Sequence, residues 1–118
     1  MNDSEEFYEK SFADLRQLLL QRVKASGRYL YLEENKKSLL ANLQKKAEQN
    51  GYGSVASQER EARNSEIFRE HLLKLSIALE EKLKAHLEYE LLIFEIECRR
   101  TIDANKRKEM ESTAANTL

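Results

Sequence analysis

The chain has 118 residues, of which 35% are charged, and it contains no proline, no tryptophan and only three glycines. So few turn-forming residues argue against a β-sandwich or β-barrel, and the length allows one domain, 1–118. No apolar run is long enough to cross a membrane. The single cysteine, Cys98, excludes an intrachain disulfide and is typical of a reducing compartment. Because the acidic start lacks the features of a signal peptide, we expect a cytoplasmic chain.

The first part of the chain predicts one long helix over about residues 4–49. Ser4 is the candidate N-cap, and the acids that follow it suit the positive end of the helix dipole. Gly27 interrupts the pattern, and we interpret it either as a close helix contact or as a bend. One apolar stripe at three- and four-residue spacing is predicted to form the seam with a second helix. It comprises Tyr8, Phe12, Leu15, Leu19, Val23, Leu30, Leu40 and Ala47.

A turn over 50–54 divides the chain into two arms. Gly51 suits the end of a helix because glycine adopts the left-handed conformation without a Cβ clash. Ser54 is a candidate N-cap for a second helix, predicted over about 55–110. The last residues, 111–118, are predicted to be a frayed polar tail.

The second helix carries two apolar stripes, so it needs more than one neighbour. One is a heptad through Leu72, Leu75, Leu79, Lys82, His86, Tyr89, Ile93 and Ile96; beside it run Leu73, Ile77, Leu87, Leu91, Phe94, Cys98 and Ile102. We therefore expect an all-α protein, a long antiparallel helical hairpin (coiled coil) that forms a homodimeric four-helix bundle. Self-association is assigned to Leu79, Leu87, Leu91, Ile93 and Phe94. The alternative is a three-helix monomer whose first helix breaks at Gly27.

Charge is arranged in alternating blocks along the chain. The segments 1–14 and 54–98 are acidic, whereas 15–50 and 99–110 are basic. Antiparallel pairing across the turn therefore brings the acidic start against the basic end. This register predicts that Glu33 lies near His71, Leu18 near His86 and Tyr8 near Ile96.

The residues that usually carry catalysis or bind metals are few. His71 and His86 lie about four turns apart, so they cannot bind one metal ion as a pair on one helix face. Neither stands three residues after a glutamate, as a di-iron helical bundle requires. Cys98 has no catalytic pattern around it and is expected to pack as a small apolar residue. The sequence predicts no enzyme, no metal and no cofactor.

Two surfaces are candidates for binding a partner. A charged cluster follows the turn, and with Tyr52 it forms a candidate protein-recognition surface at Glu59, Arg60 and Arg63. Its other interpretation is an ordinary solvated helix start. The second surface is a basic end that offers phosphate contacts through Arg99, Arg100, Lys106 and Arg107. Alternatively, the acidic start of the chain neutralises the charge of this basic end. No nucleic-acid-binding motif accompanies the basic residues.

The segment after the turn reads Ser54-Val55-Ala56-Ser57-Gln58-Glu59-Arg60-Glu61-Ala62-Arg63. With the downstream segments 94–100 and 104–107, it resembles a group of small phage and prophage helical-hairpin proteins that share Ser-Val-Ala-x-x-Glu-Arg-x-Ala-Arg. The resemblance implies a phage context and an accessory role near recombination or replication. We therefore expect a non-enzymatic adaptor for a host or phage protein. The alternatives are a nucleic-acid-binding mediator of recombination or replication and a structural coiled-coil component.

Overall fold

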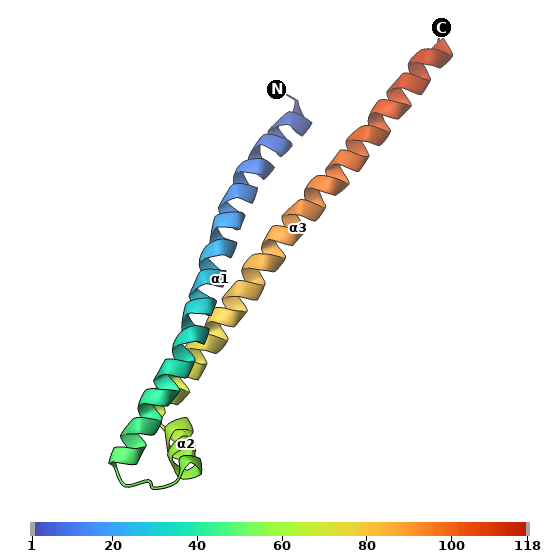
Figure 1. Cartoon of the computed structure of the whole chain (residues 1–118). Helices are drawn as coiled ribbons and strands as arrows, with labels where there is room; N and C mark the ends of the chain where they lie inside the picture. The colour runs from blue at the N-terminus through green and yellow to red at the C-terminus, as the bar shows by residue number, and fades with distance from the viewer. Residues whose placement is uncertain (1, 118) are drawn as a thin grey trace. The chain divides into compact units, whose positions relative to one another are not determined.

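The computed structural model describes residues 2–117, and within them it contains three α-helices and no strand. They are α1 (Asp3–Gln49), α2 (Val55–Asn64) and α3 (Glu66–Thr117) (Figure 1). The predicted all-α class is confirmed. The chain divides into two compact units: unit 1 is Met1–Arg22 with Ala85–Leu118, and unit 2 is Val23–Lys84. Unit 1 pairs the start of α1 with α3, and unit 2 is a helical hairpin around the turn.

The first helix begins earlier than predicted and is not interrupted. The Asn2 side chain accepts a hydrogen bond from the Glu5 backbone N–H at 2.8 Å, so Asn2, not Ser4, caps α1. The helix runs through Gly27 without a break, which contradicts the three-helix alternative that required one there. No atom lies within 4 Å of the position a Gly27 Cβ would take, so the predicted close contact is also wrong.

The turn leads into a short, firmly capped helix. Gly51 has a φ of 100°, and the Tyr52 N–H donates to the Ala47 carbonyl at 3.2 Å, which closes the end of α1. Ser54 and Ser57 form a capping box, in which each hydroxyl accepts from the other residue's backbone N–H. The capping box thereby satisfies two backbone N–H groups at the start of α2, those of Ser54 and Ser57.

The second predicted helix is divided at Ser65, where one helix over 55–110 was expected. The Ser65 hydroxyl donates to the Ala62 carbonyl at 2.8 Å and accepts from the Phe68 N–H at 3.2 Å. One side chain thus closes α2 and caps α3, with the Ser65 backbone extended between them. At the other end α3 continues to Thr117, so the predicted frayed tail is wrong over 111–117; Leu118 lies outside the described residues.

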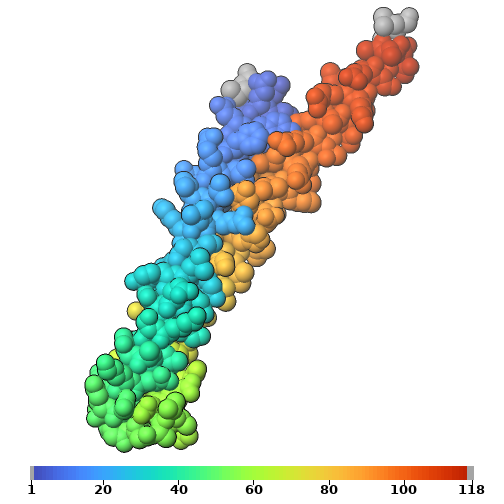
Figure 2. Space-filling model, in the orientation of Figure 1, coloured from blue at the N-terminus to red at the C-terminus, as the bar shows by residue number. Residues whose placement is uncertain are grey.

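Small residues let α2 lie close beside α1 in unit 2. Ala47 of α1 and Ala62 of α2 are almost fully buried, and Phe68 at the start of α3 is 2% exposed. Figure 2 shows the end of α1 and the yellow-green α2 as one continuous surface at this end of unit 2. The core here is apolar but narrow, and it holds α2 on the hairpin.

The seam of α1 matches the predicted stripe only in part, since Ala47 is buried and Tyr8, Leu15 and Leu40 are partly buried. Phe12, Leu19, Val23 and Leu30 are exposed, whereas Ser11 is 4% exposed. The opposing face of α3 combines small and large residues: Leu75 and Ala78 are buried in unit 2, and Ala85 and Ile96 are buried in unit 1. Leu75 and Ile96 belong to the predicted heptad, so that stripe is confirmed at these two positions. Two cation–π contacts between α1 and α3 add to the seam. Arg22 lies 5.0 Å from the centre of the Tyr89 ring, and Lys82 lies 4.8 Å from the centre of the Tyr29 ring.

The predicted register is close in one place and shifted in another. In unit 2 the His71 Nε2 lies 2.8 Å from the Leu32 carbonyl oxygen, next to the expected Glu33. In unit 1 the Tyr8 hydroxyl bonds Asp103, about two turns beyond Ile96. Helical side chains lean toward the N-terminus of their helix, so a long Tyr8 side chain reaches residues further along an antiparallel α3.

Two glycine-to-alanine substitutions test the backbone assignments. Gly27→Ala should stabilise the protein by about 1 kcal/mol, because alanine is the better helix former and its Cβ meets open space. Gly51→Ala should destabilise it, because φ is positive there. Urea denaturation measures both changes. An unstable Gly27→Ala variant would show that α1 is distorted at that residue.

Removing the shared cap should weaken the junction of α2 and α3. Ser65→Ala leaves the Phe68 N–H without its acceptor, which should cost about 1 kcal/mol. Ser76→Ala, at an exposed position within α3, is the matched control and should leave stability nearly unchanged. Equal stabilities of the two variants, measured by urea denaturation, would contradict the capping role of Ser65.

Candidate recognition surfaces

The post-turn cluster, defined as Tyr52, Glu59, Arg60 and Arg63, lies on and just before α2. Glu59 and Arg63 form an ion pair at 3.1 Å, four residues apart on the helix. Among residues 2–117, Arg60 forms no salt bridge, and its side chain is exposed. The structure therefore leaves Arg60 as the unpaired cation of this cluster.

Tyr52 is held against α2 by two polar contacts. Hydrogen bonding to the Glu61 side chain, and then the negative charge of that carboxylate, raises the pKa of Tyr52 above its usual value. The Gln58 amide also donates to the Tyr52 carbonyl oxygen at 2.9 Å. The backbone of Tyr52 is thus tied to α2, and 39% of the residue is exposed.

A polar cluster in unit 1 joins the start of α1 to α3, and we call it the Asp103 cluster. The two oxygens of Asp103 accept from Ser4 at 3.2 Å and from the Tyr8 hydroxyl at 2.8 Å. Arg99 completes it: its guanidinium donates to the Ser4 hydroxyl at 3.1 Å, lies 3.4 Å from Asp103 and stacks 5.2 Å from the Phe7 ring centre.

These contacts shift the titration of two groups in opposite directions. The hydrogen bond from Tyr8, then the bond from Ser4 and the charge of Arg99, lower the pKa of Asp103 despite partial desolvation. Desolvation, then the bond to Asp103 and its negative charge, raises the pKa of Tyr8. Folding therefore favours an ionised Asp103 beside a protonated Tyr8.

The Asp103 cluster occupies one of the four basic residues that were predicted to contact phosphate, and it leaves the other three exposed. Arg99 is half-buried and its guanidinium is committed to Ser4, Asp103 and the Phe7 ring, so it does not lie open for phosphate binding. Arg100, Lys106 and Arg107 are exposed. Asp103 is the acid that the sequence analysis did not single out, although it stands four residues after Arg99 within a basic run.

The titration shifts predict a pH dependence of stability. The contribution of Asp103 is present above its unfolded pKa of 3.8 and is lost as the pH falls through and below that value. The contribution of Tyr8 is present below its unfolded pKa of 10.0 and is lost as the pH rises above it. Tyr8→Phe should lower stability at neutral pH and flatten the alkaline loss.

Urea denaturation from pH 2.5 to 11 measures this effect. Tyr31→Phe is the matched control, because Tyr31 is exposed, and this variant should keep the wild-type pH profile. A Tyr8→Phe variant with an unchanged profile would show that the bond to Asp103 does not form in solution.

The residues assigned to self-association are mostly open to solvent. Leu79 belongs to unit 2, and Leu87, Leu91 and Phe94 belong to unit 1. Leu87, Leu91 and Phe94 are 66%, 58% and 62% exposed. Ile93 is half-buried, on the side of α3 that faces away from this stripe. Cys98 is exposed, so it does not pack as an apolar residue within the single chain.

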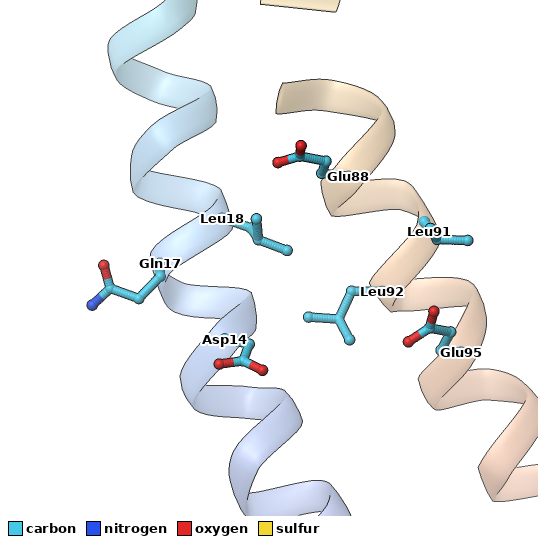
Figure 3. A pocket seen from close by; sticks show the side chains of 7 residues that line it. All are labelled: Asp14, Gln17, Leu18, Glu88, Leu91, Leu92 and Glu95. Atoms are coloured by element: carbon cyan, nitrogen blue, oxygen red, sulfur yellow. The ribbon is translucent and has the colours of Figure 1, made fainter. Parts of the chain in front are cut away.

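A groove with acidic edges runs between α1 and α3 in unit 1. It has a volume of about 380 Å³ and is lined by Asp14, Gln17, Leu18, Glu88, Leu91, Leu92 and Glu95. Figure 3 shows Leu18 and Leu92 pointing toward one another from the two helices, while Leu91 points away from α1. Sequence reasoning missed this groove because it did not place Leu18 opposite Leu92.

The side chains of the described part of the chain provide no metal site. Within residues 2–117, no group of three or more His, Cys, Asp or Glu side chains is placed to hold a metal ion. His71 instead lies against the Leu32 carbonyl. None of α1, α2 and α3 is apolar enough over a sufficient length to cross a bilayer.

Comparisons with protein-family models, with curated proteins and with solved structures found no match for this chain.

Proposed function

We propose that this chain is a non-enzymatic adaptor that binds a host or phage protein through the post-turn cluster on α2. The observation that carries the proposal is that α2 is a separate helix, capped at both ends by serines. A turn that only connected α1 to α3 would not need a second short helix of its own. The hairpin of unit 2 is then the scaffold that presents α2.

The surface of α2 has the composition of a recognition site. Tyr52 supplies a partly exposed aromatic ring near Glu61, and Arg60 supplies an exposed, unpaired cation on α2. Tyrosine and arginine are enriched among the residues that dominate binding energy at protein interfaces. Val55, the first residue of α2, is 75% exposed and adds an apolar side chain to the surface of this helix.

The contacts beneath α2 favour binding by a preformed surface. Ala47 and Ala62 are buried between α1 and α2, and Ser65 fixes the exit into α3. A surface held in its bound conformation loses less conformational entropy on association. Partner binding at α2 therefore requires no refolding of unit 2.

The resemblance of segment 54–63 to phage and prophage proteins supports a phage-type accessory role in the cytoplasm. The same segment forms α2 and its cap, so the resemblance and the proposed recognition surface coincide. Nucleic-acid binding through Arg100, Lys106 and Arg107 is the alternative, and it would use unit 1 instead.

Charge reversal on α2 tests the proposal. Arg60→Glu combined with Arg63→Glu should abolish partner binding and leave the helix content unchanged, because both side chains are exposed. Wild-type and variant proteins are used to capture partners from nuclease-treated lysate of the organism that encodes the chain. Quantitative mass spectrometry then compares the captured proteins, and circular dichroism checks the fold.

The matched control reverses two exposed lysines of α1 in the same unit, Lys37→Glu with Lys45→Glu. We expect partners retained by the wild type and this control to be lost from the α2 variant. Retention of the same partners by all three proteins would contradict recognition through α2. Salt-sensitive binding of an oligonucleotide, lost on reversal of Lys106 and Arg107, would favour the nucleic-acid alternative.

A further inference from the structure

The outer stripe of α3 in unit 1 is an unpartnered apolar face, defined by Leu87, Leu91, Phe94, Cys98 and Ile102. These residues recur at three- and four-residue spacing, so they lie on one face of the helix. All five are exposed, and none is covered by α1. A continuous apolar stripe of this length is typical of a surface that pairs with another helix.

Over residues 87–108, the charges along the two edges of this stripe change sign at Cys98. Before Cys98 the edges carry Glu88 and Glu90, and after it they carry Lys106 and Lys108. Glu88 and Lys106 lie on the edge nearer α1, since each lines a hollow together with α1 residues. At 3.6 residues per turn, Glu90 and Lys108 lie together on the opposite edge. Each edge is therefore acidic on one side of Cys98 and basic on the other.

We propose that the outer stripe binds a second copy of this chain, with the two α3 helices antiparallel and crossing at Cys98. In this arrangement Glu88 faces Lys106 of the second copy on one edge, and Glu90 faces Lys108 of the second copy on the other. Phe94 meets Ile102 of the second copy, and Cys98 lies beside its own counterpart. A two-fold axis at Cys98 repeats every one of these contacts.

The charge pattern decides the direction of pairing. A parallel pair in the same register would place Glu88 and Glu90 against the same acids, and Lys106 and Lys108 against the same bases. Like charges that face one another across a helical interface are destabilising, and edge charges set the orientation of paired helices. The antiparallel pair replaces each of these repulsions with an attraction.

Two hollows beside the stripe provide space for the side chains of the second copy. The groove at Leu18 and Leu92 has a volume of about 380 Å³. A second hollow of about 340 Å³ lies at Phe7, Phe94, Glu95, Cys98, Arg99 and Ile102. Both have apolar walls, so they are suited to the knobs-into-holes packing of a helical interface.

This self-association is independent of the recognition surface on α2, which belongs to unit 2. A pair of chains carries two copies of that surface, so the proposal adds bivalent binding to the adaptor function. Loss of either property leaves the other measurable, because the two sets of substitutions lie in different units.

Sedimentation equilibrium of the full chain is the first test. The wild type should have the mass of a dimer, and Phe94→Glu should shift it to the monomer, because a charge would lie in the apolar stripe. Tyr31→Glu is the matched control, as Tyr31 is an exposed aromatic residue of unit 2, and it should remain dimeric. A monomeric wild type, or a dimeric Phe94→Glu variant, would overturn the proposal.

Cysteine trapping tests the direction of pairing. In a Cys98→Ser background, Leu91→Cys and Asn105→Cys are made in separate chains; each position is two turns from residue 98 on the same face. Mixing the two variants and oxidising them should link unlike chains only. A disulfide between two Asn105→Cys chains would overturn the antiparallel arrangement.

Charge exchange tests the edges of the interface without changing the apolar stripe. Glu88→Lys with Glu90→Lys should weaken dimerisation roughly tenfold, because four exposed attractions become repulsions. Adding Lys106→Glu and Lys108→Glu to the same chain should restore wild-type dimerisation. If the fourfold variant stays as weak as the twofold one, these residues do not face one another.

Discussion

The narrow seam between α1 and α3 determines which large side chains this molecule exposes. In unit 1 the seam buries Ser11, Ala85 and Ile96, and in unit 2 it buries Leu75 and Ala78. Three of these five residues are serine or alanine, which let helices approach closely but cover little apolar area. Several larger residues, such as Leu91 and Phe94, stay outside the seam. The outer stripe of α3 is left exposed as a result.

Polar contacts give this narrow seam its register. In unit 1, Asp103 receives hydrogen bonds from Ser4 and Tyr8, and Arg99 links the same groups to the Phe7 ring. Such contacts are directional, so sliding one helix along the other would leave partly buried polar groups without partners. An apolar seam of leucines would tolerate a shift of one turn far better. The cluster therefore contributes more to the choice of one register than to the total stability.

The sequence predicts the helical class here better than it predicts the contacts. Gly51 and Ser54 identify the turn, because a positive φ and a serine cap have local causes. The division at Ser65 is local too, but one serine after one asparagine is a weak pattern. Hydrophobicity predicts only part of the seam: Leu75 and Ile96 are buried as expected, but in α1 the buried position is Ser11 while Phe12 beside it is exposed. Only the relative placement of two helices distinguishes those neighbours.

The same placement explains why the two proposed binding surfaces differ in kind. The proposed recognition surface combines Tyr52 of the turn with Arg60 of the short capped helix α2, which suits recognition of an unlike partner through a few strong contacts. The outer stripe of α3 is long and apolar, and its charges are arranged symmetrically about Cys98. A symmetric pattern is matched best by the same pattern reversed, which is what a second antiparallel copy offers. The surface on α2 has no such symmetry, which is why we propose an unlike partner for it.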